Sequence, residues 1–103
     1  MSEIKFTKEN FNNEVVKSNV PVLVDFWAPW CGPCRMLGPV ISEIASENPN
    51  IKVGKVNVDE EPELAAMFGI SSIPTVISFR DGQAVRSSVG VRSKQAILSM
   101  VNA

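Results

Sequence analysis

The spacing of hydrophobic and polar residues predicts a chain in which strands and helices alternate. Ile4–Phe6 alternates apolar and polar side chains, as a short half-buried strand does. Thr7 is a candidate cap for a helix over about residues 8–18. That helix would bury Phe11 and Val15, which lie four positions apart and therefore on one face.

The stretch after Pro21 predicts a central strand. Residues 22–27 carry apolar side chains on both faces, with Leu23 and Trp27 on one face and valines and Phe26 on the other. This pattern is typical of a strand that helices cover on both sides.

Three further helices are predicted downstream. The first follows Cys31 and runs to about residue 48, because its apolar residues repeat at helical spacing. Asp59 is a candidate cap for a short second helix that ends at Gly69. Ser93 is a candidate cap for a last helix near the end of the chain.

Three strands and a hairpin complete the pattern. Residues 51–58 form one strand, and residues 75–80 and 83–89 flank Asp81-Gly82, a strong signal for a tight hairpin turn. The resulting order is βαβαβαββα. It predicts an α/β fold with a parallel core and the hairpin at an antiparallel edge.

Composition narrows the class of protein. The 103 residues are 45% hydrophobic, which suits a single domain over residues 1–103. The net charge of −1 argues against nucleic acid or an anionic membrane as a partner. No apolar run approaches the ~18 residues of a membrane-spanning helix, and residues 1–6 lack the apolar core of a secretory signal peptide. We expect a cytoplasmic monomer.

Candidate chemistry is concentrated in Cys31-Gly32-Pro33-Cys34, which holds both cysteines. At a helix start, residues three apart lie on the same side, within reach of a disulfide. Gly32 allows a tight turn, and Pro33 loses nothing in the first helical turn. Unpaired N–H groups and the helix dipole should lower the pKa of Cys31 from ~8.5 to roughly 3.5–7.5. We expect Cys31 to be a partly exposed nucleophile and Cys34 a shielded resolving thiol.

Three other interpretations of the two cysteines remain open. A zinc or iron–sulfur site normally needs four ligands, and this chain has two cysteines and no histidine. Only a dimer with four shared thiolates, or added carboxylates, would complete such a site. A purely structural disulfide would close a very short loop and stabilise the fold weakly. A binding module without turnover would not need either cysteine.

Asp25 and Lys55 place charges in otherwise apolar strands. Complete burial would raise the pKa of the Asp25 carboxyl by up to ~3–5 units, toward the range that proton transfer at neutral pH requires. Alternatively, hydrogen bonds or Lys55 satisfy this carboxyl and it has no catalytic part. Lys55 can also simply extend its ammonium to solvent.

Residues 22–35, Val-Leu-Val-Asp-Phe-Trp-Ala-Pro-Trp-Cys-Gly-Pro-Cys-Arg, resemble the active-site segment of the thioredoxin family. Lys-Val-Asn-Val-Asp at 55–59 and Ile-Pro-Thr at 73–75 resemble two further family segments. The resemblance extends from about Ile4 to Val101. It implies the thioredoxin fold, a five-stranded mixed sheet with helices on both faces, and a general reductase of protein disulfides.

The resemblance also implies roles for single residues. Asp25 would lie beneath Cys34 and exchange a proton with it, and Lys55 would modulate the titration of Asp25. Pro74 would be a cis proline that faces the cysteines and hinders metal binding, although only ~5–6% of X–Pro bonds are cis. Gly32 and Pro33, with no histidine between the cysteines, would favour a reducing potential.

The same resemblance implies a docking surface and partners. A flat apolar surface around Cys31 would receive substrate proteins; it comprises Trp30, Gly32, Pro33, Val58, Ile73, Val89, Gly90 and Val91. No bound cofactor or metal is expected. Electrons would come from NADPH, or from ferredoxin, through a thioredoxin reductase, and would pass to disulfide-containing proteins.

Overall fold

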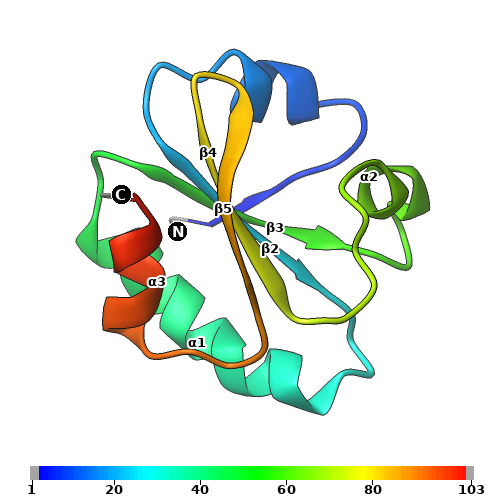
Figure 1. Ribbon diagram of the computed structural model, residues 1–103. Coiled ribbons are helices and arrows are strands. Elements are labelled where there is room, and N and C mark those ends of the chain that lie inside the picture. The colour runs from blue at the N-terminus through cyan, green and yellow to red at the C-terminus, as the bar shows by residue number, and fades with distance from the viewer. Residues whose placement is uncertain (1–2, 102–103) are drawn as a thin grey trace.

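The computed structural model describes residues 3–101 and contains one five-stranded sheet (Figure 1). Residues 1–2 and 102–103 of the predicted domain therefore lie outside the described range. The strands lie in the order β1-β3-β2-β4-β5. Strands β1, β3 and β2 are parallel, and β4 and β5 are antiparallel, which confirms the predicted mixed sheet. Their bounds are β1 (Glu3–Lys5), β2 (Val22–Trp27), β3 (Lys52–Asn57), β4 (Thr75–Arg80) and β5 (Gln83–Val89).

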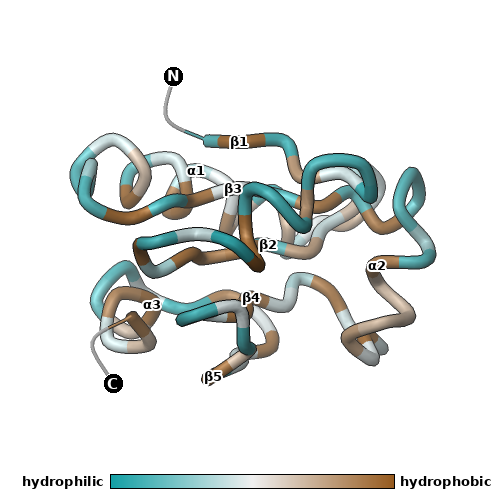
Figure 2. The backbone as a smooth tube through the Cα atoms, turned by 90° about the horizontal axis from the view of Figure 1, so that it is seen from above, coloured by the Kyte–Doolittle hydropathy of each residue, from teal (hydrophilic) through white to brown (hydrophobic). Residues whose placement is uncertain are grey.

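Helices cover both faces of the sheet, as predicted (Figure 1). Helices α1 (Gly32–Glu47) and α3 (Lys94–Val101) pack on one face, around Leu23 of β2. The short helices η1 (Asn12–Val16) and α2 (Pro62–Met67) lie on the other, where Val22, Val24 and Phe26 point. Hydrophobic segments recur along the inner strands, and hydrophilic segments mark much of the connecting chain (Figure 2). No helix within residues 3–101 has the length and apolar composition that crossing a bilayer requires.

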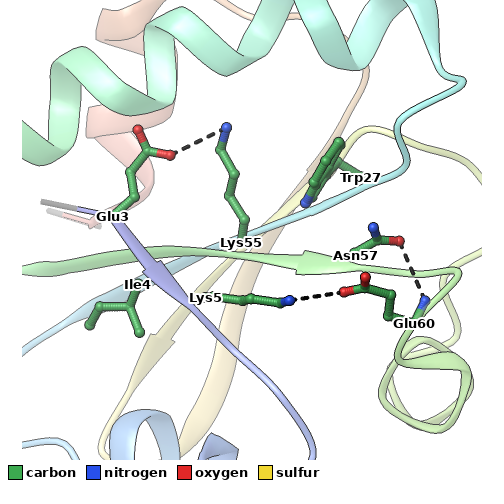
Figure 3. A pocket seen from close by; sticks show the side chains of 7 residues that line it. All are labelled: Glu3, Ile4, Lys5, Trp27, Lys55, Asn57 and Glu60. Atoms are coloured by element: carbon green, nitrogen blue, oxygen red, sulfur yellow. Dashed lines mark hydrogen bonds and ion pairs between the residues drawn. The ribbon is translucent and has the colours of Figure 1, made fainter. Parts of the chain in front are cut away.

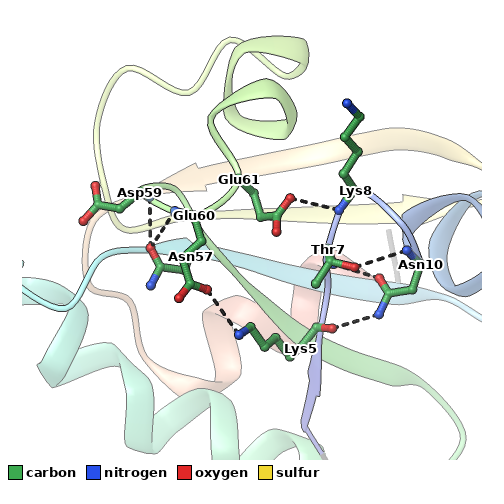
Figure 4. Close-up of polar contacts among 8 residues, drawn as sticks. All are labelled: Lys5, Thr7, Lys8, Asn10, Asn57, Asp59, Glu60 and Glu61. Atoms are coloured by element: carbon green, nitrogen blue, oxygen red, sulfur yellow. Dashed lines mark hydrogen bonds and ion pairs between the residues drawn. The ribbon is translucent and has the colours of Figure 1, made fainter.

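The helix predicted over residues 8–18 is wrong in extent and type. Thr7 Oγ1 accepts a hydrogen bond from the Asn10 N–H at 3.2 Å, and Asn10 Oδ1 accepts one from the Thr7 N–H at 2.8 Å (Figure 4). This reciprocal pair holds a turn, and only Asn12–Val16 is helical, with π-type hydrogen bonding. Two asparagines and two valines are weak helix formers, so local propensity does not extend it. Phe11 and Val15 are buried together as predicted.

The predicted hairpin and last helix are confirmed. Asp81 and Gly82 both have positive φ, at 54° and 81°, as a tight turn between β4 and β5 requires. Ser93 Oγ accepts a hydrogen bond from the Ala96 N–H at 3.1 Å and so caps α3.

Asp59 does not cap α2, contrary to the prediction. The position before this helix belongs to Glu61, whose side chain makes no cap hydrogen bond. Asn57 Oδ1 instead accepts the Asp59 N–H at 2.9 Å and holds the turn after β3 (Figure 4). The helix begins only at Pro62, so the Asp59 carboxylate is too early in the chain and points elsewhere.

Candidate functional site

Cys31 and Cys34 form a disulfide at the start of α1, with their Cα atoms 5.2 Å apart. Cys31 is the N-cap residue with an extended backbone, and Pro33 lies in the first turn. The Cys34 N–H donates to Cys31 Sγ at 3.2 Å. The predicted placement of the pair at a helix start is thus confirmed. The Cys31 sulfur lies where helix N–H groups and the helix dipole favour negative charge.

The expected difference in exposure between the two cysteines is absent. Cys31 is 5% exposed and Cys34 is 4% exposed, so the prediction of a partly exposed Cys31 is wrong for the disulfide form. The two cysteines form a buried cluster with Ala28, and Trp27, Val58 and Ile73 pack against this cluster. What separates the two residues is their position, because Cys31 precedes the helix and Cys34 lies inside it.

The loop before β4 reaches the Cys31 sulfur. Cys31 Sγ lies 3.8 Å from the backbone oxygen of Ile73. The Ile73–Pro74 peptide bond is cis, as the resemblance implied. The Gly90 N–H donates to the Pro74 oxygen at 2.8 Å and brings the loop after β5 to the same place. Val89 and Val91, on either side of Gly90, are exposed.

Trp30 forms the rim beside the disulfide and is 66% exposed. Its Nε1–H donates to Asp59 Oδ2 at 2.9 Å, which fixes the ring over the turn after β3. A groove of about 170 Å³ runs between Trp30, Val58 and Ile73. Of the predicted docking residues, Trp30, Val58 and Ile73 therefore line one groove beside the cysteines, and Asp59 contacts Trp30.

Asp25 is a buried carboxyl group in the middle of β2. The residue is 1% exposed, and within residues 3–101 neither carboxylate oxygen has a hydrogen-bond partner. Burial raises the pKa of the Asp25 carboxyl to about 7, the positive charge of Lys55 counteracts this rise, and Glu3 adds to it. Within residues 3–101, no protein group therefore donates a hydrogen bond to this carboxyl. Leu23, Asp25 and Trp27 alternate along β2, so Asp25 points to the α1 side of the sheet, where Cys34 lies.

Lys55 is the neighbour of Asp25 in the register of β2 and β3. Its ammonium forms an ion pair with Glu3 Oε1 at 3.3 Å and lies 5.8 Å from the centre of the Trp27 ring. A cleft of about 460 Å³ borders both Lys55 and Cys34. Lys55 therefore faces the site, and its ion-pair partner is Glu3.

Two residues of this region, Glu3 and Asp59, had no predicted role at the site. The capping pattern suggested a different role for Asp59, and no local pattern connects Glu3 with β3. Both contacts join segments far apart in the chain. Within residues 3–101, no group of three or more cysteine or carboxylate side chains is arranged to hold a metal ion.

The thioredoxin family profile matches residues 2–103 of this chain. The chain belongs to the thioredoxin family. It is 50% identical over 103 residues to a thioredoxin of Pyropia yezoensis, covering 99% of this chain and 96% of that protein. It is 50% identical over 97 residues to thioredoxin 1 of Synechococcus elongatus, covering 93% and 91%. It is 54% identical over 92 residues to thioredoxin 1 of a Nostoc species, covering 88% and 86%.

The function of the disulfide follows from the membership of the chain in the thioredoxin family. The chain is a thiol-disulfide oxidoreductase with protein-disulfide reductase activity, and Cys31–Cys34 is its redox-active pair. Thioredoxins use no bound cofactor, since the two sulfurs carry the electrons themselves.

Proposed function

We propose that Cys31 is the nucleophile and Cys34 the resolving thiol of this reductase. The Cys31 thiolate attacks a protein disulfide, forms a mixed disulfide and releases one substrate sulfur as a thiolate that takes up a proton. Cys34 then loses its proton and attacks Cys31 Sγ, which releases the second substrate thiol. The substrate gains two electrons and two protons, and the protein becomes the Cys31–Cys34 disulfide.

Asp25 accepts the proton that Cys34 must lose. The unpartnered carboxyl, with its pKa raised to about 7, is the observation that supports this role most strongly. A carboxyl group that is about half ionised at neutral pH can both accept and return a proton. The neighbouring Lys55 ammonium favours the charged form and so keeps the carboxyl within this range.

A thioredoxin reductase restores the dithiol, with electrons from NADPH or ferredoxin. The Gly32-Pro33 pair supports this direction, because no basic side chain between the cysteines stabilises the reduced thiolate. Thioredoxins are themselves the reference case, at about −270 mV against about −180 mV for protein disulfide isomerase. A protein with so low a reduction potential works as a reductant in a reducing compartment such as the cytoplasm, where disulfides do not persist.

Substrate proteins dock on the apolar surface around Cys31. Trp30, Val58 and Ile73 line the groove on one side. On the other side Gly90 bonds to Pro74, and its neighbours Val89 and Val91 are exposed. An extended substrate segment can pair with the backbone beside the cis Pro74 by strand addition, while its disulfide meets the Cys31 sulfur.

Asp25→Asn tests this assignment in an insulin-reduction assay with NADPH and a thioredoxin reductase. Because the amide cannot accept the Cys34 proton, we expect exchange to slow by about tenfold or more near neutral pH. Asp81→Asn is the matched control. It makes the same chemical change in the β4–β5 turn, where asparagine is well tolerated.

The pH dependence decides whether Asp25 transfers the proton. Identical rates for Asp25→Asn and the native chain across about pH 6–9 would remove the role of Asp25. In parallel, Cys34→Ser should accumulate a mixed disulfide between Cys31 and substrate, which mass spectrometry detects. Failure to trap that adduct would remove the assignment of the two sulfurs.

A further inference from the structure

Glu3 lies at the edge strand β1 and reaches two other elements. Its Oε1 forms the ion pair with Lys55 on β3 at 3.3 Å, and its Oε2 accepts a hydrogen bond from Ser42 Oγ on α1. Figure 3 shows the Glu3 and Lys55 side chains rising together from neighbouring strands toward α1. One carboxylate therefore joins β1, β3 and α1 on the side of the sheet that Asp25 faces.

This contact fixes where the Lys55 ammonium lies. A Cβ added at Gly38 would be 3.5 Å from Lys55 Nζ, so the ammonium touches α1 one turn after Cys34. Gly38, Ser42, Lys55 and Cys34 all line the cleft of about 460 Å³. The ammonium therefore lies between the Glu3 carboxylate and the region of the resolving cysteine.

Within residues 3–101, Glu3 and Lys55 are the charged groups that act on Asp25. On the other neighbouring strand, β4, the residue paired with Asp25 is the uncharged Val76. The charged side chains on the helices of this face are engaged elsewhere: the Arg35 guanidinium donates to the Pro29 oxygen, and Lys94 pairs with Glu43 and Glu47.

We propose that Glu3 is a positioning residue that holds the Lys55 ammonium at the cleft beside Cys34 and partly neutralises it, thereby controlling how readily Asp25 gives up its proton. The effect of Glu3 on catalysis rests on the proton-transfer role proposed for Asp25. The effect of Glu3 on the ionisation of Asp25 does not depend on that role. Without the negative charge of Glu3, the carboxylate form of Asp25 loses a repulsion and faces an uncompensated Lys55, so it becomes more favourable.

Glu3→Gln is the test variant, because glutamine keeps the length and the hydrogen-bonding oxygen but removes the charge. Glu60→Gln is the matched control on the same edge of the sheet. Glu60 pairs with Lys5 at 3.2 Å and does not contact Lys55 (Figures 3 and 4). The readout is the ¹³C shift of the Asp25 carboxyl against pH in the disulfide form, in which neither cysteine titrates.

We expect Glu3→Gln to lower the midpoint of the Asp25 titration by roughly half a pH unit, and Glu60→Gln to leave it unchanged. In a Lys55→Met background, Glu3→Gln should shift the midpoint less, because the part transmitted through Lys55 is gone. An unchanged midpoint in Glu3→Gln, or equal shifts in both glutamine variants, would overturn the inference.

The rate of insulin reduction against pH separates the two proposals. If the Asp25 midpoint and the rate profile of Glu3→Gln both move to lower pH, both proposals hold. If the midpoint moves and the rate profile does not, Glu3 controls Asp25 but Asp25 does not transfer the proton.

Discussion

The two faces of the sheet are covered by different types of side chain. All five phenylalanines of the chain gather on the face of η1 and α2; they are Phe6, Phe11, Phe26, Phe68 and Phe79. Their rings contact edge-on or tilted, with centroids 5.3–6.2 Å apart. The face of α1 and α3 has an aliphatic core, and β2 also places on it the Asp25 carboxyl, which has no hydrogen-bond partner among residues 3–101.

The difference shows how one strand serves stability and chemistry together. Because side chains alternate along β2, Phe26 completes the aromatic face while its neighbour Asp25 points to the opposite side. Burying the charged form of Asp25 opposes folding, and the unbroken aromatic packing offsets that cost. The unfavourable group is confined to the side on which the cysteines lie.

The largest effect should come from breaking the aromatic face. Phe79→Ala removes a buried ring that contacts Phe11 and Phe68, and should lower the free energy of unfolding by about 3–5 kcal/mol. Urea unfolding measures this loss. Val85→Ala, at an exposed site of β5, is the control and should change stability by less than about 0.5 kcal/mol. If Phe79→Ala also moved the Asp25 titration, the two faces would not be independent.

Asp25→Asn should raise the free energy of unfolding, whereas Phe79→Ala lowers it, and should do so only at higher pH. The carboxyl titrates near 3.8 when unfolded and at about 7 when folded, so the folded state binds more protons between these values. The native chain therefore loses stability as the pH rises through this range, by at most about 4 kcal/mol, whereas the variant does not. Urea unfolding at about pH 4 should show little difference, and at about pH 8 the variant should be more stable.

A stability difference for Asp25→Asn that stayed constant with pH would contradict the raised pKa. Asp81→Asn serves again as the control, since Asp81 lies in the β4–β5 turn, away from this face.

The smallest change in stability should come from the contact between Asp59 and Trp30 at the rim of the site, which belongs to neither face of the sheet. Asp59→Ala removes the hydrogen bond to Trp30 Nε1, and should cost no more than about 0.5–1.5 kcal/mol because that contact is exposed. The Trp30 ring should become more mobile, which fluorescence anisotropy in a Trp27→Phe background measures. Unchanged anisotropy would show that Asp59 does not hold the ring in solution.

Much of the site followed from local rules. The start of α1 just after Cys31, the tight turn at Asp81-Gly82 and the burial of Asp25 each depend on a few neighbouring residues or on alternation along one strand. The local rule failed for residues 8–18, where the Thr7 and Asn10 side chains bond the backbone into a turn, and for Asp59, where α2 starts later than its cap signal.

By itself, the sequence determined the order of strands and helices, the two-sided burial of β2 and the helix start that brings Cys31 and Cys34 together. These follow from side-chain period, turn chemistry and spacing, which act over a few residues. Only the tertiary structure decided that Glu3 holds Lys55, that Asp59 holds Trp30 and that Ile73 covers the Cys31 sulfur. Those contacts join residues 29–52 positions apart, so the packing of strands and loops sets them, and no local pattern encodes such distances.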